Sequence, residues 1–307
     1  MADSVPVAPA SAVSPGPRVP ALVLAAGEGR RLRPLTLLRP KPLCPMGGRT
    51  LLDHALDAVG PAASRVAVNV HHGRDQVHAH LSGRDAAGRA TPVARPGAGP
   101  GPDEGAVPMS APVHVSVEEP EALGTAGAVA HLADWLAGEP VLVVNGDTLH
   151  DADLAAFVAG WDGERVRLLT PTPGPFGPRS GVVASLLPAS VVAQLAPVPS
   201  GLWECVWRDA VAEGRLDAVH HDGRSVDCGT PADYLAANLV LAGVEGSGSI
   251  VAPGAVVTGR VVRSVVGEGA QVDGSVERCA VWPGSVVAAG EHLVGAVRAG
   301  RLTVLVR

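Results

Sequence analysis

Apolar runs and segments of helical periodicity alternate along the first 245 residues of the chain. The runs are short and rich in Val, Leu and Ala, as in strands of a parallel sheet that is buried on both faces. Between them, apolar residues recur at the three- and four-residue spacing of amphipathic helices. We predict strands over 20–26, 65–70, 113–117 and 140–144, and helices over 50–59, 75–81 and 125–136. This alternation predicts an α/β fold, with a Rossmann-like mixed sheet and helices on its faces.

The pattern becomes less regular after residue 160, where proline and glycine interrupt it. The elements expected there are strands over 165–169, 181–187 and 216–220, and helices near 188–195 and 202–213. A last helix over 232–241 follows. Thr230 is its predicted N-cap, and Pro231 stands in its first turn, where proline is tolerated best.

The last sixty residues repeat one apolar pattern at a fixed period. Val251-Ala-Pro-Gly-Ala-Val-Val257 is followed by Val266-Gly-Glu-Gly-Ala-Gln-Val272 and by Val281-Trp-Pro-Gly-Ser-Val-Val287, with an offset of 15 residues in both steps. Short β runs with a glycine turn at a fixed period predict a stacked β-solenoid. Such a solenoid leaves strand edges that a partner can cover, so a homo-oligomer through this repeat is a further expectation.

Two segments show no periodicity. Residues 1–18 consist largely of Ala, Pro, Ser and Val without a basic start, so we expect a flexible tail and no signal peptide. Residues 83–112 are rich in glycine and proline and are expected to form a mobile surface insertion. The predicted organisation is a tail (1–18), an α/β domain (19–245) that carries the insertion, and a β-solenoid (246–307).

Composition narrows the classes of function. The formal net charge of −6 argues against a general nucleic-acid binder. The four cysteines are far apart and form no C-x-x-C pair, which favours free thiols in a reducing compartment. No apolar run reaches the roughly 20 residues that a membrane span needs. We therefore expect a cytoplasmic protein without nucleic-acid or membrane partners.

Candidate chemistry begins where the first strand ends. The apolar run stops at Gly27-Glu-Gly29, and a cluster of cations follows. Glycines allow backbone N–H groups to approach an anion, and the cations neutralise it. The spacing is not that of a P-loop, because no Gly-Lys-Ser/Thr follows. The cations are Arg30, Arg31, Arg33, Arg39 and Lys41. Their place favours phosphate binding, with a solvated basic face as the alternative.

Two carboxylates complete the candidate site. Asp147 follows the strand 140–144, at the end where open α/β sheets bind ligands. Asp227 stands in a glycine-bearing loop before the last helix. Carboxylates from separate loops can share Mg²⁺, which also keeps coordination positions for substrate phosphates. Both motifs are common turns as well, so an ordinary turn is the alternative.

Together these segments resemble the signature of the sugar-nucleotide pyrophosphorylases, the sugar-1-phosphate nucleotidylyltransferases. The matching motifs are Leu24-Ala-Ala-Gly-Glu-Gly-Arg30, Arg33-Pro-Leu-Thr36, Arg39-Pro-Lys-Pro-Leu43, Leu123-Gly-Thr-Ala-Gly127, Val144-Asn-Gly-Asp147 and Asp227-Cys-Gly-Thr-Pro-Ala-Asp-Tyr234, in the family's order. The C-terminal repeat is similar to the left-handed β-helix that many members carry. The resemblance covers residues 19 to about 300.

The resemblance implies a role for each matching residue. The backbone of Ala25 to Gly27 would hold the base and ribose, Arg30 would grip the β- and γ-phosphates, and Lys41 would stabilise charge on the α-phosphate. Asp147 and Asp227 would hold Mg²⁺. The residues implied to bind the nucleotide are Leu24, Ala25, Ala26, Gly27, Gly29, Gly124 and Thr125. A sugar 1-phosphate oxygen would attack the α-phosphorus in line, so positioning and charge neutralisation supply the rate.

The base is predicted from Glu119, with Glu118 beside it. A carboxylate only accepts hydrogen bonds, and guanine offers adjacent N1–H and N2–H donors. Uracil and thymine place carbonyl oxygens on both sides of N3–H, which a carboxylate would repel. The segment therefore favours GTP and resembles the mannose-1-phosphate guanylyltransferase branch. The alternative is that both carboxylates merely end a strand at the surface.

The sugar side departs from the family's pattern. Members usually carry a Glu-Lys-Pro motif whose lysine holds the sugar phosphate, and residues 160–182 lack it. Arg167 or Arg179 could replace that lysine, although arginine is not equivalent to lysine at a specific phosphate site. Trp203 and Trp207 are four residues apart and are expected to pack in the core. The pairs His71-His72 and His220-His221 are interpreted as solvated loop residues, because they lack metal-ligand spacing.

The leading hypothesis is a Mg²⁺-dependent nucleotidylyltransferase that joins an NTP, preferably GTP, to a sugar 1-phosphate and releases pyrophosphate. The alternative is a non-catalytic paralogue that binds sugar nucleotides and regulates an active pyrophosphorylase, which the missing Glu-Lys-Pro motif favours. The retained Arg30, Lys41, Asp147 and Asp227 favour the enzyme. An acyltransferase built on the β-helix ranks last, because the repeat is short and shows no evident catalytic histidine.

Overall fold

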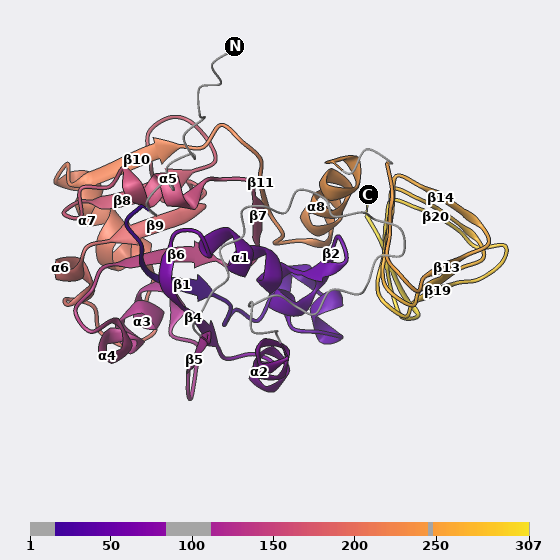
Figure 1. Ribbon diagram of the computed structural model, residues 1–307, viewed down its shortest axis with the longest axis horizontal. Helices are drawn as coiled ribbons and strands as arrows, with labels where there is room; N and C mark the ends of the chain where they lie inside the picture. Colours follow the sequence, from indigo (N-terminus) through magenta and orange to yellow (C-terminus); the bar gives the residue numbers. More distant parts are fainter. Residues whose placement is uncertain (1–15, 84–111, 245–247, 307) are drawn as a thin grey trace, which may run out of the picture.

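The computed structural model describes residues 16–83, 112–244 and 248–306. Most of these residues form an α/β unit, and the C-terminal strands form a stack of coils beside it (Figure 1). Apart from their last and flanking residues, the predicted tail and the predicted insertion lie outside the described residues. The predicted fold class, an α/β domain followed by a left-handed β-helix, is confirmed.

The described residues of the α/β unit form a seven-stranded mixed sheet in the order β10-β8-β9-β6-β1-β4-β5. β9 runs antiparallel to both neighbours, and the other neighbouring pairs are parallel. The strands are β1 (Val19–Leu24), β4 (Ala63–Val70), β5 (His114–Val117), β6 (Val141–Asn145), β8 (Val166–Thr170), β9 (Ala184–Leu187) and β10 (Leu216–His220). The loops that follow the parallel strands therefore meet at one edge, which we call the carboxyl edge.

The unbroken apolar sequence of β1 follows from its place inside the sheet. Ala21 and Val23 pack into the core on one face, and Leu22 packs into the core on the other. All three side chains are fully buried. The strand ends at Leu24, so the next residues belong to the loop at the carboxyl edge.

Helices cover both faces of the sheet (Figure 1). One face packs against α1 (Leu51–Val59), α2 (Arg74–Ser82) and α5 (Leu154–Ala159). The other packs against α3 (Gly124–His131), α4 (Ala133–Leu136), α6 (Ala189–Val192), a π-helical turn (Trp203–Trp207) and α7 (Arg208–Ala212). None of the described helices is long and apolar enough to cross a membrane.

The helices α1 and α8 (Pro231–Val244) begin at capping residues that the sequence indicates. Thr50 and Asp53 form a capping box, in which the Asp53 N–H donates to Thr50 Oγ1 over 3.1 Å. At α8 the Asp233 N–H donates to Thr230 Oγ1 over 3.2 Å. The prediction of Thr230 as an N-cap is therefore confirmed, and α8 extends three residues beyond the predicted end at 241.

Short elements connect the sheet to the rest of the molecule. Between β1 and α1 lie three 3₁₀ turns (Arg30–Leu32, Leu35–Leu37 and Lys41–Leu43) and the small hairpin of β2 (Pro45–Met46) and β3 (Arg49–Thr50). We call residues 30–46 the cation segment. Outside the main sheet, β7 (Thr148–His150) pairs antiparallel with β11 (Ser225–Asp227), and we call this pair the carboxylate ribbon.

The C-terminal strands stack with the predicted period. Val251 pairs with Val266 and Val266 with Val281, each 15 residues apart, and the last step from Val281 to Arg298 is 17 residues. In the described part of the chain the coils form three parallel ladders, β12-β15-β18-β21, β13-β16-β19 and β14-β17-β20 (Figure 1). The strands are β12 (Ile250–Val251), β13 (Val256–Val257), β14 (Arg260–Val262), β15 (Val265–Val266), β16 (Gln271–Val272), β17 (Ser275–Glu277), β18 (Ala280–Val281), β19 (Val286–Val287), β20 (His292–Val294), β21 (Ala296–Ala299) and β22 (Leu302–Leu305).

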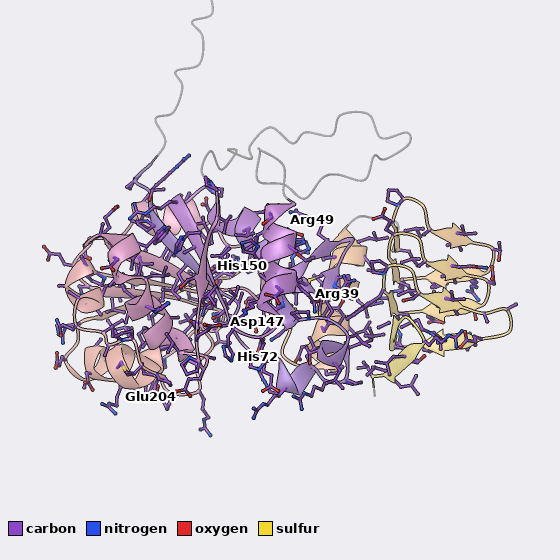
Figure 2. All side chains as sticks on the ribbon, turned by 90° about the horizontal axis from the view of Figure 1, so that it is seen from below. Arg39, Arg49, His72, Asp147, His150 and Glu204 are labelled. Atoms are coloured by element: carbon purple, nitrogen blue, oxygen red, sulfur yellow. The ribbon has the colours of Figure 1, made fainter. Side chains whose placement is uncertain are left out.

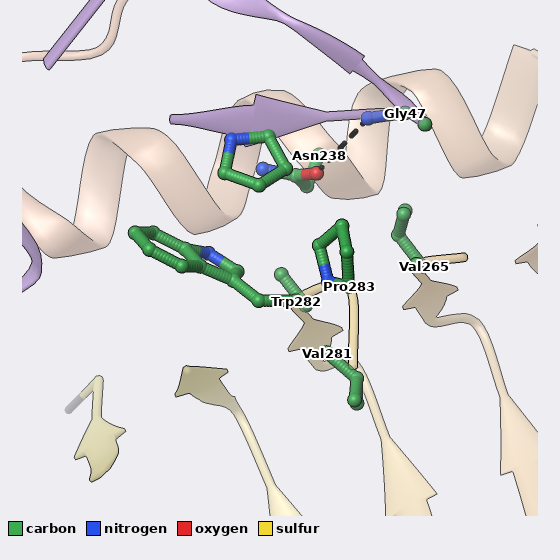
Figure 3. A pocket seen from close by; sticks show the side chains of 10 residues that line it. Gly47, Asn238, Val265, Val281, Trp282 and Pro283 are labelled. Atoms are coloured by element: carbon green, nitrogen blue, oxygen red, sulfur yellow. Dashed lines mark hydrogen bonds between the residues drawn. The ribbon is translucent and has the colours of Figure 1, made fainter. Parts of the chain in front are cut away.

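The β-helix and the α/β unit share one apolar core. Tyr234 on α8 and Trp282 on the β-helix lie in this core, with ring centroids 6.4 Å apart. Arg39 of the cation segment stacks on the Trp282 ring, with its guanidinium carbon 5.7 Å from the centroid. A small pocket of about 10 Å³, room for about one water molecule, lies beside this contact (Figure 3). Residues that line it include Gly47, Asn238, Val265, Trp282 and Pro283.

Several predicted elements differ from the observed ones. The helix predicted over 125–136 is two helices, because the Leu132 N–H bonds to Val129 O and tightens the chain into a turn. The strand predicted over 181–187 begins only at Ala184. The helix expected near 188–195 is a single turn, and the one expected over 202–213 begins as a π-helical turn. The sequence analysis did not predict β2, β3, β7, α5 or β11, and the remaining predicted strands and helices are present.

Candidate active site

The loop after β1 is held by a buried hydrogen bond and by a glycine. The Ala25 N–H donates to Asn69 Oδ1 on β4 over 2.7 Å. Gly29 has a φ of 66°, which glycine adopts without strain. A Cβ atom at Gly29 would lie 2.8 Å from Thr36 Cγ2 and 3.0 Å from Lys41 Cβ. The glycine therefore allows the lysine's segment to close onto the loop.

The backbone donors of this loop divide into two groups. Ala25, one of the three residues expected to hold the base and ribose, uses its N–H for Asn69. Within the described residues the N–H groups of Ala26 and Gly27 have no acceptor. Both donors are therefore available to a ligand.

The cations separate into a buried one and several exposed ones. Lys41 is 8% exposed and forms an ion pair with Asp147. Arg31 lies 3.5 Å from the Asp227 carboxylate. Arg30, the predicted phosphate grip, is exposed and pairs with Glu28. The structure thus joins Lys41 to Asp147 and Arg31 to Asp227, whereas the Arg30 side chain is exposed to solvent.

The carboxylate ribbon brings the two predicted metal ligands to neighbouring strands. Asp147 comes directly before β7, and Asp227 is the last residue of β11. Asp227 pairs with Thr148, and the Cys228 N–H donates to the Asp147 carbonyl oxygen over 3.0 Å. Residues 80 positions apart in sequence therefore lie side by side near Lys41. Figure 2 shows Asp147 near the middle of the molecule, with Arg39 on the side of the β-helix and Glu204 on the opposite side.

The other end of the carboxylate ribbon is closed by Asp151. Its carboxylate accepts hydrogen bonds from the Arg224 backbone N–H at 2.7 Å and from Arg224 Nε at 3.1 Å. His221 Nε2 lies 2.9 Å from the same carboxylate. The pKa of the neighbouring His150 is lowered from 6.5 to about 4, first by burial and second by repulsion from His221, and Asp151 opposes both effects. We call the contacts of Asp151 the ribbon clasp.

A buried network that the sequence analysis did not predict joins three loops of the carboxyl edge. Glu118 is fully buried and accepts hydrogen bonds from Asn69 Nδ2 and from the Leu123 N–H, both at 2.7 Å. Asn69 in turn holds Ala25. We call this set the buried relay. Its signal in the sequence is a polar Asn69 within the apolar strand Val66-Ala-Val-Asn-Val70.

Glu119, the predicted contact to the base, lies differently from Glu118. Its side chain is 61% exposed and forms an ion pair with Arg74 on α2. The alternative that both carboxylates end a strand at the surface is wrong for Glu118, which is buried. Within the described residues Glu119 makes no contact with the relay.

Gly124 and Thr125 connect the relay to the segment that precedes the π-helical turn. Gly124 has a φ of 69°, and a Cβ atom there would lie 2.5 Å from the Ser200 carbonyl oxygen. Thr125 Oγ1 accepts a hydrogen bond from the Leu202 N–H over 2.8 Å. Both residues therefore fix residues 200–202 at the carboxyl edge. Their predicted contact with a nucleotide stays a prediction.

Three aromatic side chains form a cluster at the same edge. The Phe176 ring lies 5.8 Å from Trp203 and 5.7 Å from Trp207, measured between centroids. We call these three residues the aromatic cluster. Phe176 and Trp207 pack against the core under α3, as expected for Trp207, while all three remain partly exposed.

The two arginines considered for the sugar phosphate lie in different places. Arg167 forms an ion pair with Asp217, with Nε 3.1 Å from the carboxylate, and its guanidinium lies over the Phe157 ring on the α5 face. Arg167 therefore has a structural role on the α5 face of the sheet. Arg179 is exposed in the loop between β8 and β9, and it has no ion-pair partner among the described residues.

One histidine of each pair and two buried thiols have structural contacts in this arrangement. His71 Nδ1 lies 2.9 Å from the Glu118 carbonyl oxygen, and His220 Nδ1 lies 3.2 Å from the Thr170 carbonyl oxygen. These contacts tie loop ends together. Burial raises the pKa values of Cys44 and Cys228 to about 12, so neither is a nucleophile at neutral pH.

The donor set at the carboxylate ribbon fits a hard divalent cation. Asp147 and Asp227 supply carboxylate oxygens, which Mg²⁺ prefers. In this structure Lys41 pairs with Asp147, and Arg31 pairs with Asp227. No group of three or more His, Cys, Asp or Glu residues suited to a metal occurs among the residues that the structure describes. A cation held by two carboxylates would therefore keep its remaining positions for water and substrate phosphates.

Sequence comparisons identify proteins that are similar to this chain. A family model described as "Nucleotidyl transferase" matches residues 20–169. The chain is 31% identical over 261 residues to an N-acetylmuramate alpha-1-phosphate uridylyltransferase of Caulobacter vibrioides, covering 75% of this chain and 99% of that protein. It is 32% identical over 142 residues to a mannose-1-phosphate guanylyltransferase of Mycobacterium tuberculosis, covering 46% of this chain and 33% of that protein.

A solved structure shares the fold. A putative glucose-1-phosphate thymidylyltransferase from Bacillus anthracis superposes with a TM-score of 0.55 and 17% sequence identity. The superposition covers 73% of this chain and 95% of that one. At this identity the likeness concerns the fold alone.

Proposed function

Because this chain belongs to the family of sugar-1-phosphate nucleotidyltransferases, we propose that its carboxyl edge joins the nucleotidyl group of an NTP to a sugar 1-phosphate and releases pyrophosphate. The observation that carries the proposal is the convergence of Lys41, Asp147, Asp227 and Arg31 beside the loop after β1. This set can neutralise a triphosphate and a bound divalent cation together.

The residues divide the work of the reaction. Asp147 and Asp227 would hold Mg²⁺, which when bound neutralises phosphate charge. Lys41, which pairs with Asp147, would neutralise charge on the α-phosphate. Arg30 and Arg31 take the outgoing β- and γ-phosphates. Backbone N–H groups of Ala26 and Gly27 orient the nucleotide, and the sugar phosphate oxygen attacks in line on the α-phosphorus.

The nucleobase has two candidates, which rest on different observations. UTP is favoured by the similarity to a uridylyltransferase over 99% of that protein's length. GTP, the prediction from sequence, is favoured by the guanylyltransferase relative and by the carboxylates at 118 and 119. Glu118 already accepts hydrogen bonds from Asn69 and Leu123, and Glu119 forms an ion pair with Arg74. We therefore place UTP first and GTP second.

The test is pyrophosphate release. The full chain is incubated with Mg²⁺, each of UTP, GTP, TTP, CTP and ATP in turn, and a panel of hexose and N-acetylhexosamine 1-phosphates. We expect the unaltered chain to release pyrophosphate with at least one pair of NTP and sugar 1-phosphate. The Asp147→Asn variant should lose this release, and the Asp162→Asn variant should keep it. Asp162 is a surface residue that only caps a turn. No release with any pair contradicts the proposal and supports a non-catalytic binding protein.

A second variant tests the base. If Glu119 reads guanine, Glu119→Gln weakens the preference for GTP, because an amide nitrogen then meets a guanine donor. The ratio of kcat/KM for GTP to that for UTP is the measurement. An unchanged ratio removes Glu119 from the base site. Glu121→Gln, in the same exposed loop, is the matched control.

A further inference from the structure

Glu28 is an acid in a stretch of the chain that otherwise carries only positive charge. Residues 25–46 contain five Arg or Lys residues and a single carboxylate, that of Glu28. Its Oε2 accepts a hydrogen bond from Arg30 Nε, and its Oε1 accepts one from Arg33 Nη2. His72 Nε2, in the loop after β4, lies 4.0 Å from Oε2. The carboxylate therefore takes the place of a bound anion among these side chains.

The backbone around Glu28 offers unpaired donors and open space. The N–H groups of residues 26–31 have no acceptor within the part of the chain that the structure describes. Successive free N–H groups in a loop favour an anion. The φ of Gly27 is not left-handed, and a Cβ atom there would meet nothing within 4 Å outside its chain neighbours. Packing within the chain therefore leaves room for a ligand beside Gly27.

The arginines that Glu28 binds remain accessible. The side chains of Arg30 and Arg33 are 78% and 48% exposed, whereas that of Glu28 is 23% exposed. The hydrogen bond from Arg30 lowers the pKa of Glu28, although desolvation opposes this effect, so the carboxylate is ionised at neutral pH. Arginine binds carboxylate and phosphate oxygens through the same planar group. A phosphate can therefore replace the carboxylate on these two side chains.

We propose that Glu28 is an internal counter-ion, which binds Arg30 and Arg33 until the β- and γ-phosphates of the NTP displace it. This inference rests on the proposed function. Because the arginines must leave the carboxylate before they bind phosphate, the exchange weakens the affinity for the NTP and for pyrophosphate alike. The carboxylate returns to the arginines as pyrophosphate dissociates. Glu28 thus limits inhibition by the product without touching the reacting atoms.

The amide variant of this residue is the direct test. Glu28→Gln keeps the size of the side chain and removes its charge, so the dissociation constant for pyrophosphate should fall about three- to tenfold. KM for the NTP should fall by a similar factor and kcat should not rise, because substrate and product are bound more tightly together. Glu213→Gln is the matched control, since Glu213 pairs with Arg215 two residues later, at the end of α7.

Binding measured without turnover separates this inference from the proposed function. Isothermal titration of the full chain with inorganic pyrophosphate in the presence of Mg²⁺ gives the dissociation constant whether or not a sugar 1-phosphate reacts. Tighter binding by Glu28→Gln than by the unaltered chain supports the counter-ion even if no NTP and sugar pair releases pyrophosphate. Equal or weaker binding by Glu28→Gln, or binding by neither protein, overturns the counter-ion. Pyrophosphate release by the unaltered chain would then still support the proposed function.

A second background separates displacement from simple charge repulsion. In the double variant Arg30→Gln/Arg33→Gln the carboxylate has lost both arginines. Adding Glu28→Gln to this background should therefore change the dissociation constant for pyrophosphate by less than about twofold. A gain as large as in the unaltered background would overturn the counter-ion, because Glu28 would then act only by repelling the ligand.

Discussion

At the scale of single residues, Glu118 shows how a buried carboxylate can hold the loop after β1 without touching it. It binds Asn69 and the Leu123 N–H, and Asn69 holds the Ala25 N–H. Glu118→Ala would leave two buried donors unpaired, which costs about 1–3 kcal/mol each. We expect a loss of about 2–4 kcal/mol in the free energy of unfolding and a higher KM for the NTP. Urea unfolding and initial rates measure the two effects.

The buried relay also predicts a specific pattern among its variants. Asn69→Asp places a second carboxylate against Glu118 and should raise the KM for the NTP more than Asn69→Ala does, because the new charges repel. Glu121→Gln, exposed in the same loop, should change neither quantity. Equal KM values in Asn69→Asp and in the unaltered chain would show that the relay stabilises the fold without positioning the nucleotide loop.

His150 gives the stability of the protein a predictable pH dependence. Burial and the nearby His221 lower its pKa from 6.5 to about 4. Between these values the unfolded chain binds a proton that the folded chain refuses, so stability falls as the pH falls through this window. From pH 7 to pH 5 the expected loss is up to about 2 kcal/mol. His54, whose pKa is also lowered by burial, adds a loss of the same sign.

Comparison with a His150→Asn variant isolates that contribution. The variant lacks the titrating group, so its free energy of unfolding should fall less between pH 7 and pH 5 than that of the unaltered chain. Urea unfolding at both pH values is the measurement, and His131→Asn, on the exposed end of α3, is the control. An equal decrease in the free energy of unfolding from pH 7 to pH 5 in His150→Asn and in the unaltered chain would contradict the prediction.

Single residues were also the scale at which sequence reasoning reached its limit. Lys41, Asp147 and Asp227 could be proposed because each follows a recognisable strand or glycine turn. Glu118 and Asn69 could not, because their roles depend on which strands are neighbours, and β5 begins at His114, 44 positions after β4 ends at Val70. Arg31 could not be distinguished from Arg30, since a short turn decides which of two adjacent side chains faces Asp227.

At the scale of elements, the carboxylate ribbon fixes the separation of Asp147 and Asp227, the two carboxylates proposed to hold Mg²⁺. Its register is held at the far end by the ribbon clasp, where Asp151 binds the backbone and side chain of Arg224. Asp151→Ala would let β11 slip or fray, and supporting residues of metal sites typically contribute 10- to 100-fold in metal affinity. We expect the Mg²⁺ concentration for half-maximal activity to rise at least about tenfold.

High Mg²⁺ provides the discriminating measurement for the ribbon clasp. If Asp151 positions the carboxylates, excess Mg²⁺ should restore most of kcat in Asp151→Ala. Asp134→Asn, an exposed residue in the first turn of α4, should show an unchanged Mg²⁺ requirement. A lower kcat that excess Mg²⁺ leaves uncorrected would mean that the clasp supports folding and does not set the metal site.

Elements with strong local signals were predictable, and those governed by tertiary contacts were not. The strand β1, the capped helix α1 and the 15-residue repeat follow from apolar periodicity and capping residues in the sequence itself. The π-helical turn at Trp203–Trp207 has no such local signal. It forms where Leu202 is tied to Thr125, a partner 77 residues away, so periodicity indicated an ordinary helix.

At the scale of the whole molecule, the β-helix supports the cation segment, which carries Lys41. One core contains Leu32, Leu35 and Met46 of the cation segment together with Ala280 and Val297 of the β-helix. α8 lies between the two and packs against β15, β18 and β21. The Tyr234 hydroxyl of α8 donates to the Pro45 carbonyl oxygen. The cation segment is therefore packed between a helix and a solenoid, which keeps Lys41 against Asp147.

This arrangement predicts that a change in the β-helix alters catalysis at a distance. Trp282 is 6% exposed and touches both Arg39 and Tyr234. Trp282→Ala should lower the free energy of unfolding by about 3–5 kcal/mol, the usual cost of removing a buried tryptophan. Because Arg39 then loses its stacking partner two residues before Lys41, kcat should also fall at temperatures where circular dichroism shows a folded protein. Trp161→Ala, at the opposite end of the sheet, should cost stability but leave kcat of the folded protein unchanged. Equal kcat values in both variants would show that the β-helix stabilises the chain without positioning the lysine.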